Sequence, residues 1–81
     1  MITRTINGLV YEIATPSHWQ LQGYPIELTY LGGNDGHPSG WFLSCLRFDA
    51  NLNQRVDMRP LASREAGHRL IEEAFNIKQV G

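Results

Sequence analysis

The sequence predicts an α+β domain, in which a four- to five-stranded antiparallel sheet carries one C-terminal helix on one of its faces. Two patterns support this prediction: apolar residues at every second position in short runs before Pro60, and apolar residues at every third or fourth position after Ser63. With 81 residues the chain is long enough for one domain and too short for two, so we expect a single domain over residues 1–81.

Asn7-Gly8 predicts the first hairpin. The dipeptide separates two runs rich in β-branched residues, at about 2–6 and 9–14. A type I′ turn needs positive φ at both central residues, and Asn followed by Gly meets that requirement readily. We therefore expect two paired strands, of which the second has one apolar face formed by Leu9, Tyr11 and Ile13.

Residues 15–24 are interpreted as a connection, because proline and glycine interrupt any regular pattern there. Trp19 and Tyr24 in this segment are too apolar to stay in water, so we expect part of it to pack on the body of the domain. A third strand follows at about 25–31. The glycine-rich segment 32–40 cannot hold a regular element, and we expect a mobile hairpin loop.

The next segment, at about 41–48, is apolar on both faces, which is typical of a strand that is covered on both sides. One face is formed by Trp41, Leu43 and Cys45, and the other by Phe42, Leu46 and Phe48. The Asp- and Asn-rich segment 49–53 then predicts a turn. A short fifth strand is expected at about 54–59, ended by Pro60, which lacks an amide donor.

The C-terminal helix is predicted to begin after Ser63, a residue type that caps helix N-termini. Its apolar face combines Gly67, Leu70, Ile71 and Ala74. A glycine inside a helix costs about 1 kcal/mol relative to alanine. The place of Gly67 on the apolar face therefore indicates that the helix backbone approaches the sheet closely. We expect a helix of about thirteen residues, roughly 20 Å long, that ends near Asn76.

A helix of this length covers one face of the sheet, and no other segment is long enough to cover the second face fully. We therefore expect Trp41, Leu43 and Cys45 to lie on a second face that the helix leaves uncovered. Two interpretations stay open. In one, segment 15–24 folds over this face and buries Trp19 against Trp41. In the other, the face stays open and binds another protein chain.

Composition narrows the cellular setting. The formal net charge is −1, so the chain has no strong field to steer nucleic acid or an anionic membrane, and little charge repulsion opposes self-association. A single cysteine permits no internal disulfide, which suits a reducing compartment. No signal-peptide pattern and no stretch of about 20 apolar residues is present. We expect a cytoplasmic location and no membrane association.

The histidines and the cysteine show no catalytic or metal-binding pattern. His18, His37, His68 and Cys45 match no zinc spacing, so neither a metal nor a cofactor is expected. An enzyme subunit or small-ligand pocket near His18, His37 and Cys45 is the least favoured hypothesis. Its only nucleophile lies in the most apolar segment, where a thiol behaves as an inert apolar group.

The favoured hypothesis is a small non-enzymatic protein-interaction module that uses the apolar second face of the sheet. It would act as a homodimer, or as an adaptor or inhibitor that docks on a larger protein. Trp and Tyr are enriched at binding hot spots. The predicted contacts are Trp41, Leu43, Trp19 and Tyr24, with the 32–40 loop as an adaptable rim.

The alternative hypothesis is a nucleic-acid-binding module. Five arginines follow one another between positions 47 and 69, and a strand followed by a helix would place several of them along one edge, where they contact phosphates. The residues are Arg47, Arg55, Arg59, Arg64 and Arg69. Three acidic residues in the same stretch reduce its charge excess to +2 (5 − 3), which makes a solvated face with helix ion pairs the competing interpretation.

Overall fold

The computed structural model describes residues 2–32 and 39–80, and of residues 77–80 it describes the backbone alone. In chain order the elements are β1 (Ile2–Ile6), β2 (Leu9–Thr15), β3 (His18–Leu21), β4 (Glu27–Leu31), β5 (Gly40–Ser44), α1 (Ala50–Val56) and α2 (Arg64–Val80). The antiparallel α+β architecture is therefore confirmed, but the described part of the chain has two helices where the sequence predicted one.

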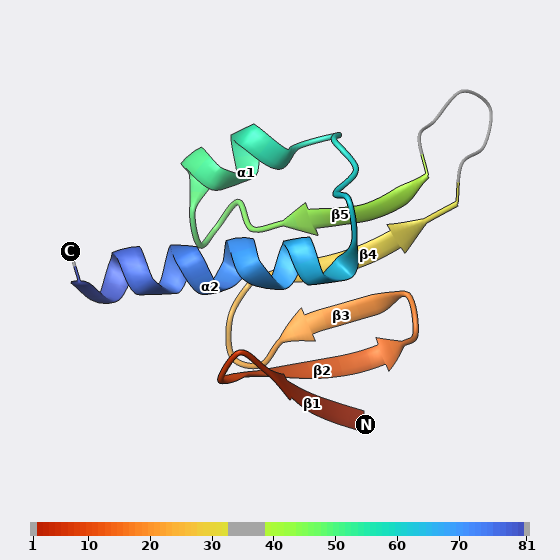
Figure 1. Cartoon of the computed structure of the whole chain (residues 1–81), viewed down its shortest axis with the longest axis horizontal. Helices are drawn as coiled ribbons and strands as arrows, with labels where there is room; N and C mark the ends of the chain where they lie inside the picture. The colour runs from red at the N-terminus through yellow and green to blue at the C-terminus, as the bar shows by residue number, and fades with distance from the viewer. Residues whose placement is uncertain (1, 33–38, 81) are drawn as a thin grey trace.

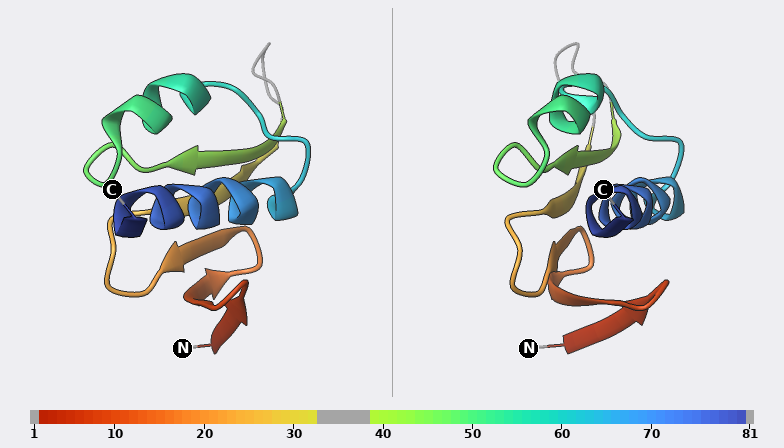
Figure 2. Two further views of the ribbon diagram at one scale, coloured as in Figure 1. Left: turned by 60° about the vertical axis from the view of Figure 1, so that its left-hand side comes forward. Right: turned by 90° about the vertical axis from the view of Figure 1, so that its left-hand side faces the viewer.

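The five strands form one sheet in which each strand pairs with its neighbours in sequence, in the order β1-β2-β3-β4-β5. All four pairings are antiparallel. Figure 1 shows α2 crossing one face of this sheet, while α1 lies beside β5 at the sheet's edge. The views in Figure 2 place α2 on one side of the sheet, and no helix of the described residues covers the opposite face.

The first hairpin forms as predicted. Asn7 and Gly8 have φ values of 54° and 81°, the double positive φ that a type I′ turn requires. β1 and β2 pair from Ile2 with Ile13 to Ile6 with Leu9. Because β1 ends the sheet, one of its sides has no partner strand among the described residues.

Segment 15–24 was expected to be a connection, and that expectation is wrong. It contains β3, which is central in the sheet and pairs with both β2 and β4. The strand is only four residues long, and it lies between Pro16 and Gly23, whose presence concealed it. Its two outward residues alternate with Trp19 and Leu21, which are buried.

The expected fifth strand at 54–59 is also wrong, because residues 50–56 form α1. Asp49 caps this helix, its side chain accepting a hydrogen bond from the backbone N–H of Leu52 at 3.1 Å. Leu52 and Val56, one helical turn apart, are buried. The preceding strand ends at Ser44 instead of continuing to residue 48.

The long helix confirms two sequence-based expectations. Its N-terminus is capped by Ser63, whose Oγ accepts a hydrogen bond from the backbone N–H of Ala66 at 3.2 Å. At Gly67 an added Cβ would lie 2.5 Å from Cδ2 of Leu28, so the helix backbone does lie against the sheet. The helix is longer than expected, with 17 residues.

Candidate protein-binding groove

The strand register decides which side chains α2 covers. Directly paired residues of neighbouring strands point to the same face of a sheet. Pairing runs from Ile13 to Trp19, from Trp19 to Leu28 and from Leu28 to Leu43. Since Leu28 contacts Gly67 of α2, this whole row lies on the covered face.

Two of the predicted interface residues are therefore in the core. Trp19 and Leu43 are only 3% and 4% exposed. Their assignment to an uncovered second face is wrong, and so is the idea that a loop carries Trp19 over that face. Cys45, which was placed on the same face, is also buried.

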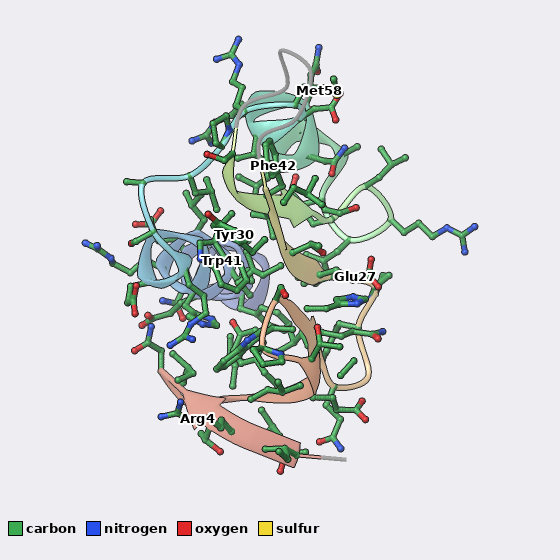
Figure 3. All side chains as sticks on the ribbon, turned by 90° about the vertical axis from the view of Figure 1, so that its right-hand side faces the viewer. Arg4, Glu27, Tyr30, Trp41, Phe42 and Met58 are labelled. Atoms are coloured by element: carbon green, nitrogen blue, oxygen red, sulfur yellow. The ribbon has the colours of Figure 1, made fainter. Side chains whose placement is uncertain are left out.

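The other two predicted residues stay partly accessible. Trp41 packs edge-on against Tyr30, with ring centroids 5.7 Å apart, and Figure 3 shows both rings on the side of α2. Tyr24 contacts Phe48 and Phe75 edge-on at the far end of the core, at 5.9 and 4.8 Å. The structure thus distributes the predicted interface over separate places instead of bringing it together.

The predicted alternation of side chains between the two faces of β5 was correct, but the face covered by the helix was assigned wrongly. Phe42 was expected beneath the helix and instead points to the uncovered face, as its pairing with Thr29 requires. The two faces were exchanged because β3 was not predicted. With β3 in the sheet, Trp19 and Leu21 lie on the same face as Leu43, so this face has the larger apolar surface and the helix packs on it. A sequence reading without β3 cannot make this comparison.

Most of the uncovered face is polar. One row combines Glu12, Gln20, Glu27 and Ser44. Glu27 also meets His18 at 3.3 Å, and in Figure 3 it projects on the side opposite α2. Such a surface is stable in water without a partner.

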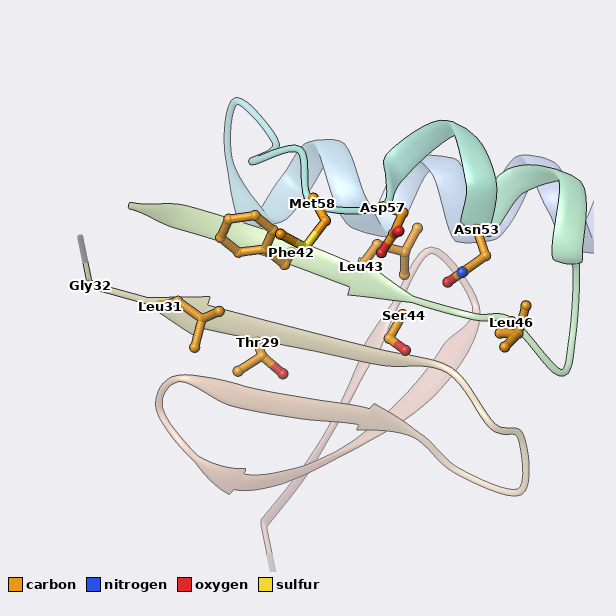
Figure 4. A pocket seen from close by; sticks show the side chains of 10 residues that line it. All are labelled: Thr29, Leu31, Gly32, Phe42, Leu43, Ser44, Leu46, Asn53, Asp57 and Met58. Carbon is orange, nitrogen blue, oxygen red and sulfur yellow. The ribbon is translucent and has the colours of Figure 1, made fainter. Parts of the chain in front are cut away.

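The exception is an apolar groove at the β5 end of this face. It is a hollow of about 720 Å³ between β4, β5 and α1. We call it the β5–α1 groove. Figure 4 shows its lining side chains, which are Thr29, Leu31, Gly32, Phe42, Leu43, Ser44, Leu46, Asn53, Asp57 and Met58.

Large apolar side chains in this groove are open to solvent. Leu31 is 51% exposed, Leu46 62% and Met58 75%. Phe42 is half-buried among them, and Figure 4 places Phe42 and Met58 at one end of the groove and Leu46 at the other. Isolated exposed apolar residues need no explanation, but several that share one hollow are typical of an interaction site.

Met58 is unusual in its backbone as well. Its φ is 59°, a left-handed conformation that disfavours side chains with a Cβ by roughly 1–2 kcal/mol. The residue follows the C-terminus of α1, a position that glycine usually occupies. Here the chain holds a flexible thioether side chain in that position and directs it to solvent. Strain of this kind is a reason to look for function.

The two polar side chains from α1 and its C-terminus, Asn53 and Asp57, play different structural roles at the groove. The side chain of Asn53 fastens α1 to the sheet, because its Oδ1 accepts a hydrogen bond from the backbone N–H of Cys45 at 2.9 Å. Asp57 is exposed at the rim, and among the described residues its carboxylate has no ion pair. The groove therefore offers an apolar floor with one free negative charge.

Arginines of the alternative hypothesis do not share a strand. Arg64 and Arg69 belong to α2 and line a cavity beside the β1–β2 turn, and the Arg64 guanidinium lies 4.1 Å from the centroid of the Trp19 ring. Arg47 follows β5, while Arg55 and Arg59 lie in and after the last turn of α1. A nucleic-acid interface stays a prediction, without the strand-to-helix edge on which it was based.

The residues of the third hypothesis are separated too. His18 is on the uncovered face with Glu27, whereas Cys45 is buried. Burial, with a smaller contribution from the nearby Asp49 carboxylate, raises the pKa of the Cys45 thiol to about 11, so it is not a nucleophile at neutral pH. His37 and most of the 32–40 loop lie outside the described residues.

Within residues 2–32 and 39–80, no cluster of three or more His, Cys, Asp or Glu side chains is suited to a metal ion. No helix in the same ranges has the length and apolar character needed to cross a bilayer. Comparisons with protein-family models, with curated proteins and with solved structures give no match.

The groove residues were missed because α1 was missed. Asp57, Met58 and Asn53 were assigned to a turn and a strand, which placed them elsewhere. One pattern in the sequence does indicate α1 and hence these groove residues. Asp49 followed by Leu52 and Val56 has the cap and the four-residue spacing of a short helix.

Proposed function

We propose that this chain is a non-enzymatic protein-binding module, whose β5–α1 groove receives apolar side chains of another protein. The observation that supports this proposal best is the exposure of Met58, Leu46 and Leu31 around one hollow, on the sheet face that α2 leaves uncovered. The class of function is the one the sequence favoured, but of the four predicted contact residues only Leu43, itself buried, lines the groove.

The occupant we propose is a short segment of a different protein. A stable dimer usually buries about 800 Å² on each subunit, from some 20–30 residues a side. The groove offers four large apolar side chains that are at least partly exposed, Leu31, Phe42, Leu46 and Met58, with a polar surface around them. An apolar surface of this size fits one or two anchor side chains of a bound peptide better than the interface of a permanent dimer.

Asp57 indicates the charge of the partner. Its carboxylate is exposed at the rim and has no ion pair among the described residues. A lysine or arginine beside the apolar anchor of the partner would complement it, and such rim charges mainly set orientation and association rate. We therefore expect a segment that combines an apolar anchor with a basic residue.

A selection of displayed random short peptides on the wild-type protein tests the proposal. The affinity of each enriched peptide is then measured by fluorescence anisotropy for the wild type and for Leu46→Ser and Met58→Gly. We expect enriched peptides to carry an apolar residue near a basic one, and each substitution to weaken binding about tenfold, which corresponds to the loss of one anchor contact.

Ile2→Ser is the matched control. Ile2 is 67% exposed, about as much as Leu46, but it lies on β1, three strands away from β4. Peptides that bind the groove bind this variant with unchanged affinity. Equal losses in all three variants, or no enrichment at all, would disprove the proposal. Light scattering measures self-association. If the wild type is a dimer and Leu46→Ser makes it a monomer, the groove binds a second copy of this chain, and the proposal of a different protein is overturned.

A further inference from the structure

A second cavity lies on the other side of the sheet, between α2 and the turn that joins β1 to β2. Its volume is about 280 Å³, and it is lined by Ile6, Asn7, Arg64, Glu65, His68 and Arg69. It is separate from the β5–α1 groove, with which it shares no residue. Any ligand here would be independent of the function proposed above.

His68 makes this cavity chemically unusual. The residue is 1% exposed, and neither of its ring nitrogens has a hydrogen-bond partner in the described structure. Its ring packs edge-on against Tyr11 and Trp19, with centroids 4.5 and 5.4 Å apart. Buried polar atoms are nearly always hydrogen-bonded, so an imidazole with two unpaired nitrogens beside a cavity indicates a partner within that cavity.

Two further buried atoms, on residues that interact with His68, also lack partners in the part of the chain that the structure describes. They are the hydroxyl of Tyr11 and Nε of Arg64. Nε–H of arginine and an imidazole N–H are both donors, and the neighbouring Asn7 amide adds more. A ligand that satisfies the donors of this set has to present acceptor atoms, while the second nitrogen of the neutral imidazole is itself an acceptor.

Charge around the cavity favours an anionic ligand. Arg64 and Arg4 both lie over the ring of Trp19, at 4.1 and 5.9 Å from its centroid, and Arg69 lines the cavity. Against these three positive charges stand two carboxylates, Glu65, which is 3.6 Å from Arg64, and Glu72, whose charge acts on Tyr11. The N-terminal amides of α2 are partly occupied by Ser63, so the donors available to a ligand are side chains.

We propose that this cavity binds a small organic carboxylate. Its oxygens accept hydrogen bonds from Nε–H of Arg64 and from the ring N–H of His68, which is a charge-assisted arrangement. Its carbon body contacts the apolar side chain of Ile6. A bound anion also favours the imidazolium form of His68. Tyr11 on β2 contacts the imidazole, and Arg64 and Glu65 on α2 act on its charge. Further charged groups nearby are Arg69 in the cavity lining, Arg4 on β1 over the Trp19 ring, and Glu72 on α2, which acts on Tyr11.

The test is a titration of the wild-type protein with acetate, propionate and benzoate at constant ionic strength, observed through the ring resonances of His68 by NMR. Phosphate and chloride serve as comparison anions. We expect saturable shifts with the carboxylates, weaker or absent shifts with the other two anions, and a higher His68 pKa in the presence of saturating carboxylate. The pKa change separates binding beside the imidazole from binding elsewhere.

Two substitutions define the site, and one controls for charge. Arg64→Met and His68→Phe, which keeps a flat ring in the core, should each weaken carboxylate binding about tenfold. Arg47→Met removes an arginine outside the cavity and should leave affinity unchanged. Equal binding of all five anions would reduce the site to general electrostatic attraction, and the absence of any saturable shift in the wild type would mean that only water occupies the cavity. Either result overturns the proposal.

Discussion

The two ends of the sheet depart from ordinary burial in opposite ways. At the β1–β2 end, beneath α2, the domain buries polar atoms of His68, Tyr11 and Arg64 that have no partner among the described residues. At the β5 end, on the uncovered face, it leaves Leu31, Leu46 and Met58 in water. A buried polar group and an exposed apolar cluster are the two observations that carry information about function. The comparison teaches that this small domain has two places where a second molecule would satisfy what the fold leaves unsatisfied.

The largest expected difference between the faces concerns their aromatic residues. Trp19→Ala should lower the free energy of unfolding by about 3–5 kcal/mol, because the side chain is 3% exposed and fills the centre of the core. Phe42→Ala, on the uncovered face, should cost about 1 kcal/mol. Urea unfolding followed by circular dichroism measures both. Similar losses in the two variants would contradict the assignment of the faces.

The next effect is a dependence of stability on pH. Burial, with Arg64 as a second cause, lowers the pKa of His68 from 6.5 to about 4. The unfolded chain therefore takes up a proton at a higher pH than the folded one. Stability is fully retained above pH 6.5, falls as the pH drops from 6.5 to about 4, and changes no further through this group below that value.

Because folding lowers the pKa of His68 from 6.5 to about 4, the loss of stability over that window is on the order of 3 kcal/mol. Urea midpoints measured at intervals across the window give the slope. His68→Leu removes the titrating group, so its midpoints should vary less with pH than those of the wild type. Parallel profiles for the two proteins would refute the assignment to His68.

The third prediction addresses the tightness of the covered face. Gly67→Ala places a Cβ 2.5 Å from Cδ2 of Leu28, which is 0% exposed and cannot move into solvent. Overpacking of roughly 1–3 kcal/mol outweighs the gain of about 1 kcal/mol in helix propensity. We expect a net loss of about 1 kcal/mol in thermal or urea unfolding. Glu73→Ala, an exposed substitution in the same helix, is the neutral control, and a stabilised Gly67→Ala would show that the contact is loose.

The smallest expected effect has the opposite sign. Met58→Gly relieves a left-handed conformation worth roughly 1–2 kcal/mol and adds glycine's entropy cost of about 0.5–1 kcal/mol. The net gain should be about 0.5 kcal/mol in urea unfolding. Met58→Ala removes the same exposed side chain but keeps the strained φ, so its stability should stay near that of the wild type. A destabilised Met58→Gly would mean that the Met58 side chain contributes to the fold itself.

The sequence was most informative where one residue type has one structural use. Asn7-Gly8 specified a turn with two positive φ values, Ser63 specified a helix start, and Gly67 specified a close approach of helix and sheet. The first two depend on local geometry alone, and the third on a glycine placed on the apolar face of a helix. Such features are readable without knowledge of the rest of the fold.

The features of the fold that could not be predicted depend on how segments far apart in the sequence pack together. The alternation along β5 was visible, but the face that α2 covers is decided by the total apolar surface of five strands, including the four-residue β3. The candidate groove needed α1 as its wall. Short elements such as α1 give weak periodic signals, and here Asp49 and Asn53 fit a turn as well as a helix cap.

The sequential order of the strands has a consequence for the growing chain. Every strand finds its partner in the preceding one, so the hairpins form from local contacts that favour rapid assembly. The cover for Trp19, Leu28 and Leu43 is encoded after all five strands, in α2. A nascent chain that has not yet reached Arg64 carries the apolar face of its sheet in contact with solvent or the translation machinery, which makes that interval the period of greatest exposure to aggregation.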